Sequence, residues 1–248
     1  TLRADNVRDF AVIAGTAFEM LSAETQGVTV RSFYAAGLPE DRAQGEISLQ
    51  AALDAVDAFT DAYGAYPYGT LDVVEAVYNY GGMEYPGLVR ISQSYASDLA
   101  DSGDESLRLD VAHEVAHQWF YAVVGNDQYR EAWLDESFAV YSELVYRAQR
   151  GASDEELQTI VDGMDGGAAR IDLPYDEFLD ADGSPSAYVT AVYRTGAVFL
   201  WRLRQAMGAD AFGALLRDWY QTHQFEEVTT AQFRAAVLAA DDSDAVQA

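Results

Sequence analysis

The sequence contains no cysteine and no lysine. Without cysteine, the chain forms neither disulfides nor thiolate metal sites. All 15 basic residues are arginine, against 41 acidic residues, and the formal net charge is -26. A field of this sign repels phosphate backbones and anionic lipid headgroups, which argues against nucleic acids and membrane surfaces as partners. Metal ions and amine-bearing substrates are favoured instead.

Long apolar segments are also missing. No apolar run approaches the roughly 20 residues of a membrane span, and no signal-like segment opens the chain. Half of the 248 residues are nevertheless hydrophobic, which is enough for a large core. The length predicts one large domain or two closely packed halves. Because the first residue is Thr1, we expect a processed form or an excised domain of a longer, multidomain chain.

Hydrophobic periodicity predicts strands first and helices second. Strands are expected at 7–14, 28–36, 71–80 and 88–92, with a helix at 47–63. Helices are expected at 112–123, 133–150, 154–164, 187–207, 210–222 and 230–240, and loops at 162–167 and 180–185. This order favours an α+β fold, in which a strand-rich half (1–104) packs on a mostly helical half (105–248).

Two of the three histidines lie four residues apart on the first of these later helices, in His113-Glu114-Val115-Ala116-His117. Residues at this spacing project from one face of a helix, so both imidazoles can bind one metal ion. Glu114 lies roughly 60° around the helix from His117. It can therefore reach a metal-bound water without being a ligand, and can take the proton as that water attacks.

A catalytic zinc ion needs a third protein ligand and leaves its fourth position open. Glu136 follows His117 on the next helix, which a short antiparallel connection would return to the histidine face. A solvated helix face is the alternative, but this combination of residues arises by chance in roughly one of ten thousand sequences of this composition. The sequence therefore predicts a zinc site, with the third histidine, His223, expected at the surface.

These residues resemble the aminopeptidase N family of zinc metallopeptidases, gluzincins with a thermolysin-like catalytic domain. The resemblance extends along the chain in three segments. Gly81-Gly82-Met83-Glu84-Tyr85 is similar to the family's Gly-x-Met-Glu-Asn, and Trp133-Leu134-Asp135-Glu136-Ser137-Phe138-Ala139 is similar to its Trp-Leu-Asn-Glu-Gly-Phe-Ala. Tyr193-Arg194-Thr195-Gly196-Ala197 is similar to its Tyr-Glu-Lys-Gly-Ala. It implies that residues 1–248 form a single catalytic domain, without the family's N-terminal β-rich domain and its C-terminal domains.

The resemblance also implies a role for each matching residue. Glu114 is the general base, and Tyr193 stabilises the oxyanion. Glu84 binds the free amine of the substrate, beside a peptide-binding segment that includes Gly81, Gly82 and Met83. One zinc ion is held by His113, His117 and Glu136.

Each role has a structural alternative. Without the resemblance, Glu84 would be expected at the surface, and the pair Gly81 and Gly82 would be expected to form an ordinary hairpin turn. Tyr193 would be expected to pack in the core. Tyr188 is a weaker candidate for the neighbourhood of Tyr193. The chain departs from the family at Asp135, which could orient a zinc-bound histidine or face solvent. Serine at 137 and tyrosine at 85 also replace the family's glycine and asparagine.

The expected function is a zinc-dependent aminopeptidase that hydrolyses the first residue from peptides with a free N-terminus. A gluzincin endopeptidase that cleaves inside chains is the nearest alternative, because Tyr85 departs from the family pattern next to the amine-binding glutamate. An epoxide-hydrolysing relative and a catalytically idle binding domain are further alternatives. An idle domain would usually have lost a metal ligand or the base, whereas this sequence keeps all four residues.

Overall fold

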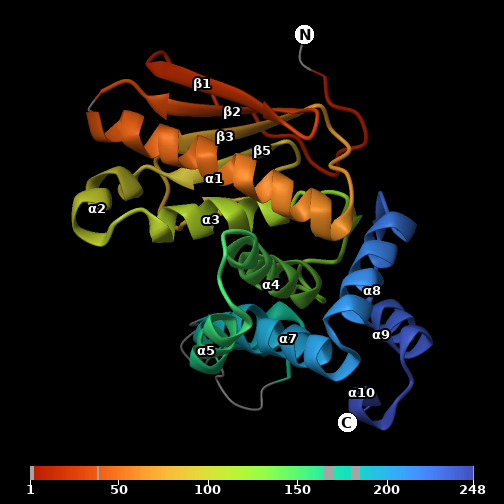
Figure 1. Cartoon of the computed structure of the whole chain (residues 1–248). Coiled ribbons are helices and arrows are strands. Elements are labelled where there is room, and N and C mark those ends of the chain that lie inside the picture. The colour runs from red at the N-terminus through yellow and green to blue at the C-terminus, as the bar shows by residue number, and fades with distance from the viewer. Residues whose placement is uncertain (1–2, 38, 165–169, 180–184, 248) are drawn as a thin grey trace. The chain divides into compact units, whose positions relative to one another are not determined.

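The computed structural model of the chain describes residues 3–37, 39–164, 170–179 and 185–247 (Figure 1). The chain divides into two compact units: unit 1 comprises Thr1–Asp61 and Ala65–Ala122, and unit 2 comprises Ala62–Gly64 and Val123–Ala248. The main sheet belongs to unit 1 and most of the helices belong to unit 2. The expected α+β class, with strands first and helices second, is therefore confirmed.

Unit 1 is built on a five-stranded sheet with the order β1-β2-β3-β5-β4. β1 and β2 form an antiparallel hairpin, β2, β3 and β5 run parallel, and β4 is antiparallel to β5. The short β4 thus forms one edge of the sheet. The strands span Phe18–Thr25 (β1), Val28–Ala35 (β2), Thr70–Ala76 (β3), Gly82–Met83 (β4) and Leu88–Ser92 (β5).

Three helices complete unit 1: α1 (Pro39–Tyr63, whose last residues belong to unit 2), α2 (Ser94–Ser102) and α3 (Glu105–Ala116). Helix α1, orange in Figure 1, runs along the sheet. It buries small residues such as Ala51, Ala52 and Ala55, each 0% exposed. Phe59, farther along α1, packs edge-on against Trp119, with ring centroids 5.6 Å apart. These contacts form the core beside α3, which carries the histidine pair.

Several sequence-based boundaries in unit 1 are wrong. The helix expected at 47–63 begins eight residues earlier, at Pro39, and the strand expected at 71–80 ends at Ala76. No strand forms at 7–14, and the partner of β2 is instead β1, joined to it by a two-residue turn in which Gln26 and Gly27 have φ of 50° and 77°. Positive φ at both turn residues is the hairpin geometry that matches strand twist. The helix expected at 112–123 ends at Ala116, because the chain turns at His117 and Tyr121 has a φ of 137°.

Glu75 on β3 is an acidic side chain inside unit 1. It is 5% exposed, and neither carboxylate oxygen has a hydrogen-bond partner within the described residues. Burial, and secondarily the charge of Asp41, raise the pKa of Glu75 to about 8. In the unfolded chain a glutamate ionises near pH 4.3, so the folded state holds a proton that the unfolded state releases between these two pH values.

We expect the Glu75→Gln variant to gain stability over the parent chain as the pH rises. The gain should be near zero at low pH, where both states are protonated, and should grow by roughly 2 kcal/mol between pH 6 and pH 8. Urea unfolding at these two pH values measures it. Glu24→Gln, on exposed β1, is the matched control and should follow the parent chain. An unchanged difference between the two pH values for Glu75→Gln would contradict the assignment.

Unit 2 is mostly helical. Four helices expected from the sequence appear within one residue of their expected bounds, as α4, α5, α8 and α9. The segment expected as one helix at 187–207 is divided by a π-helical turn. The elements are β6 (Val124–Gly125), α4 (Trp133–Gln149), α5 (Asp154–Met164), η1 (Tyr175–Glu177), α6 (Ser186–Tyr188), the π-helix η2 (Val189–Thr195), α7 (Gly196–Met207), α8 (Ala209–Thr222), β7 (Glu226–Glu227), α9 (Thr230–Ala240) and α10 (Asp244–Gln247).

The core of unit 2 is aromatic. Trp133 and Phe138 of α4 pack against Phe233 of α9, with ring centroids 5.7 and 5.2 Å apart. Trp219 of α8 packs edge-on against the same ring at 5.2 Å. This cluster fixes the first turns of α4, where Glu136 lies.

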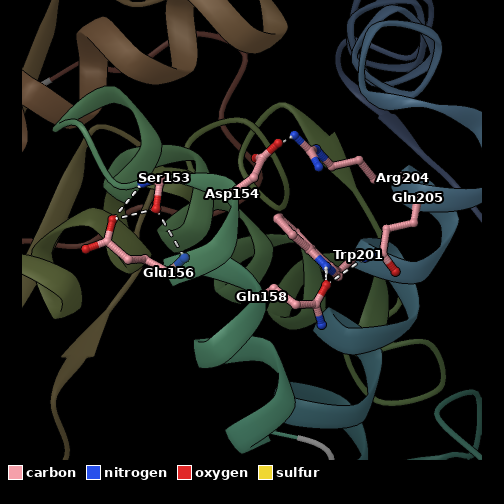
Figure 2. A network of polar contacts seen from close by, with 7 residues as sticks. All are labelled: Ser153, Asp154, Glu156, Gln158, Trp201, Arg204 and Gln205. Carbon is pink, nitrogen blue, oxygen red and sulfur yellow. Dashed lines mark hydrogen bonds and ion pairs between the residues drawn. The ribbon is translucent and has the colours of Figure 1, made fainter.

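Polar contacts connect α5 to α7 on the other side of unit 2 (Figure 2). Gln158 accepts hydrogen bonds from Trp201 at 2.8 Å and from Gln205 at 2.6 Å, and Arg204 lies 3.2 Å from Asp154.

Two loops are expected in this unit, at 162–167 and 180–185. Residues 162–164 instead continue α5, and residues 165–167 and 180–184 lie outside the described residues. Within the described ranges, no helix has both the length and the apolar character that crossing a membrane requires.

Candidate active site

The residues expected at the site fall into two clusters, one in each unit. In unit 1, His113 and His117 project from the end of α3, with their Nε2 atoms 3.2 Å apart. The Nδ1 of His117 donates a hydrogen bond to the backbone oxygen of Phe120 at 3.1 Å. This bond places the proton on Nδ1, so the lone pair of Nε2 faces the second imidazole. His117 is 1% exposed, so its ring is held in place, and two imidazole nitrogens lie next to each other at the end of α3.

Glu114 lies between the two histidines in sequence and is 5% exposed. Its Oε2 has no hydrogen-bond partner among the residues that the structure describes. Burial raises the pKa of Glu114 to about 8, against the lowering effect of the two histidines. The negative charges of Glu84 and Asp110 act in the same direction as burial and contribute to this value. A buried carboxylate with an unused oxygen is suited to accept a proton once a cationic group is present beside it.

The glycine pair packs against the acidic face of α3. A Cβ on Gly82 would lie 2.4 Å from the Cγ and Oε1 atoms of Glu114, and one on Gly81 would lie 2.3 Å from the carboxylate of Asp110. Only glycine at these positions allows the β4 backbone to lie this close to the helix. The glycines therefore bring the edge of the sheet directly beside Glu114.

Glu84 follows β4 and is 7% exposed, so the surface alternative for this residue does not hold. Gln118, fully buried, links its neighbourhood to the end of α3: its amide donates to the backbone oxygen of Tyr85 at 3.1 Å and accepts from the backbone N–H of Gly87 at 2.8 Å. The sequence pattern around Gln118 does not indicate this role. Its two hydrogen-bond partners lie more than 30 residues away in the sequence, so no local pattern predicts these contacts.

The second cluster lies in unit 2. Glu136, in the first turn of α4, accepts a hydrogen bond from the hydroxyl of Tyr193 at 2.6 Å. Burial, and then the charge of Glu136, raise the pKa of Tyr193 above its usual range, so the phenol stays protonated as a hydrogen-bond donor. Tyr188 packs edge-on against Tyr193, with ring centroids 5.9 Å apart. The structure thus brings together Glu136, Tyr193 and Tyr188.

Burial and contacts define the surroundings of two further residues, Asp135 and His223. Asp135 is 1% exposed and accepts a hydrogen bond from the backbone N–H of Glu136 at 2.6 Å, so it does not face solvent. His223 lies at the end of α8, partly exposed, and its Nδ1 is 3.0 Å from a carboxylate oxygen of Glu226. In its own unit it is paired with Glu226, and its ring packs at a tilt of 56° against Trp219.

Sequence comparison links the chain to known peptidases. It is 31% identical to aminopeptidase N of Streptomyces lividans over 179 residues, covering 68% of this chain and 21% of that protein. It is 27% identical to human endoplasmic reticulum aminopeptidase 1 over 220 residues, covering 84% of this chain and 23% of that protein. The chain thus spans less than a third of the length of these relatives.

Structure comparison and a family profile agree with this result. A zinc metallopeptidase of Deinococcus radiodurans superposes with a TM-score of 0.70 at 23% identity, covering 93% of this chain and 50% of that one. Yeast LTA4 hydrolase superposes with a TM-score of 0.65 at 21% identity, covering 91% and 38%. The profile of the Peptidase family M1 domain matches residues 47–247. The chain therefore belongs to peptidase family M1.

Proposed function

We propose that this chain is the catalytic domain of a zinc-dependent aminopeptidase, and that residues 1–248 act as one domain within a longer, multidomain protein. Family membership and the named aminopeptidases among its relatives support this proposal. The observation that carries it is the pair of histidine nitrogens, 3.2 Å apart at the end of α3, together with the buried carboxylate of Glu114 on the same helix.

The residues fit a zinc ion. Two nitrogens at 2.0–2.1 Å from one tetrahedral ion lie about 3.3 Å apart, close to the 3.2 Å between the two Nε2 atoms. His113, His117 and Glu136 each offer one ligand atom, a set that zinc prefers. When bound, zinc supplies a Lewis acid that polarises a carbonyl and lowers the pKa of water.

The remaining residues handle the substrate and the proton. Glu114 accepts the proton of the attacking water and returns it to the leaving amine. Tyr193 donates its protonated hydroxyl to the oxyanion that develops on the carbonyl. Glu84 pairs with the free α-amine, while the open edge of β4, with Gly81, Gly82 and Met83, receives the peptide backbone as an added strand. The surplus of negative charge favours a substrate that arrives amine-first.

The aminopeptidase proposal predicts a strict need for a free amine. The chain should hydrolyse aminoacyl fluorogenic amides, lose this activity with a chelator and regain it with zinc. Peptides acetylated at the N-terminus should not be cleaved. Cleavage of free and acetylated peptides at similar rates would contradict exopeptidase action and indicate the endopeptidase alternative, whereas the absence of any hydrolysis would favour the idle-domain alternative.

The same assay with Glu84→Gln tests the amine site. The amide keeps the shape of the side chain but removes its charge, and a hydrogen bond to a charged group contributes about 1.5–3 kcal/mol. We therefore expect kcat/KM to fall by roughly 10–100-fold. Glu24→Gln on β1 is the control and should leave kcat/KM unchanged. An unaltered kcat/KM in Glu84→Gln would rule out the proposed amine contact.

A further inference from the structure

The segment that carries Tyr193 has an unusual backbone. Residues Val189–Thr195 form a π-helix between α6 and α7. A π-turn holds one residue more than an α-turn, and each added residue turns the side chains beyond it by about 100° around the helix axis. The direction in which Tyr193 points therefore depends on this turn. Such turns are rare inside helices and frequently lie at functional sites.

Ser137 supplies a contact to this turn. Its hydroxyl donates a hydrogen bond to the backbone oxygen of Val192 at 2.5 Å, and the side chain is fully buried. Ser137 is the neighbour of Glu136 on α4, and Val192 is the neighbour of Tyr193. Two consecutive residues of α4 thus contact two consecutive residues of the π-helix. The carboxylate of Glu136 accepts from the hydroxyl of Tyr193, and the hydroxyl of Ser137 donates to the backbone oxygen of Val192.

Gly196 leaves the space in which this contact forms. A Cβ at position 196 would lie 1.9 Å from the hydroxyl oxygen of Ser137 and 2.7 Å from its Cβ. Any larger residue at 196 would therefore displace the serine. In the family segment that the sequence resembles, position 137 is glycine, which has no hydroxyl to donate.

We infer that Ser137 is a positioning residue, which holds the π-helix so that the hydroxyl of Tyr193 stays directed at the site beside Glu136. This inference rests on the proposed function, in which Tyr193 stabilises the oxyanion. Ser137 acts only through the backbone of Val192, and the 2.6 Å contact between Tyr193 and Glu136 is the geometry that it maintains.

A double-mutant cycle between Ser137 and Tyr193 tests the inference. Ser137→Ala should lower kcat by about tenfold, the value of one hydrogen bond, and leave KM within about twofold. In the Tyr193→Phe background the same change should have no further effect on kcat, because the hydroxyl that Ser137 directs is gone. Ser137→Gly, which places no new atoms opposite Gly196, should give the same result and serves if the alanine variant folds poorly.

Ser142→Ala is the matched control. Ser142 is also fully buried on α4, but its hydroxyl bonds to the backbone oxygen of Phe138 at 2.7 Å and to Tyr63 at 2.8 Å, away from the π-helix. It should lower the melting temperature without lowering kcat. An equal loss of kcat from Ser137→Ala with and without Tyr193, or an equal loss in the Ser142 control, would overturn the inference. Unchanged kcat in Tyr193→Phe alone would instead contradict the proposed role of Tyr193.

Discussion

The Glu114→Gln variant is expected to bind zinc as the parent chain does and to hydrolyse aminoacyl amides about 10²–10⁴-fold more slowly. Glutamine has nearly the same shape, so it fits the space beside Gly82, where no Cβ is tolerated. Its amide cannot accept a proton from water. The loss should therefore appear in kcat, measured with the fluorogenic amides, with the zinc content of the purified variant unchanged.

Glu105→Gln is the matched control for this prediction. Glu105 lies in the first turn of the same helix and is exposed, so the same chemical change there should alter neither zinc content nor kcat. Full activity in Glu114→Gln would contradict the general-base role. A loss of zinc from the same variant would show instead that Glu114 supports the metal.

The second large effect is expected from His117→Ala. His117 is buried and held by its hydrogen bond to Phe120, so alanine removes a preorganised nitrogen that no neighbouring side chain replaces. Loss of groups that merely support metal ligands costs about 10–100-fold in metal affinity, and loss of a ligand should cost more than about 100-fold. Hydrolysis should fall with the zinc content, as measured on the same sample.

His223→Ala is the control, since it removes the remaining histidine of the chain. His223 contacts Trp219 and Glu226 in unit 2, and neither residue belongs to the proposed site. Zinc content and activity should both stay at the level of the parent chain. A His117→Ala variant that keeps its zinc and its activity would show that the histidine pair is not the metal site.

Local patterns predicted part of this fold well. The apolar spacing of α4 and α9 matches their buried faces, so their bounds could be placed within one residue. The four-residue spacing of the histidines is a property of one helix and needs no long-range contact to bring them together.

Other features depend on contacts that local patterns do not contain. β1 is an edge strand with little burial, so it has no clear apolar alternation. Trp119 and Phe120 continue the apolar spacing of α3 but are buried in the turn that follows it. The spacing of apolar residues alone does not distinguish a continued helix from a buried turn.

The hydrogen bonds that hold the backbone around the candidate site were likewise not predictable from local sequence. Gln118 is fixed by backbone groups of the β4–β5 connection, and Ser137 by a carbonyl on a distant helix. The π-turn that sets the direction of Tyr193 looks like ordinary helix in the sequence. Residues that support a proposed site are thus found through tertiary contacts, whereas the residues proposed to bind zinc and to act in catalysis belong to recognisable sequence motifs.

We propose that one zinc ion, bound by His113, His117 and Glu136, makes this chain a peptidase. The most direct test is to titrate the chelated, metal-free chain with zinc while following hydrolysis of an aminoacyl amide. Activity should rise in proportion to added zinc and stop rising at about one ion per chain. Hydrolysis that is unaffected by complete removal of the metal would contradict it.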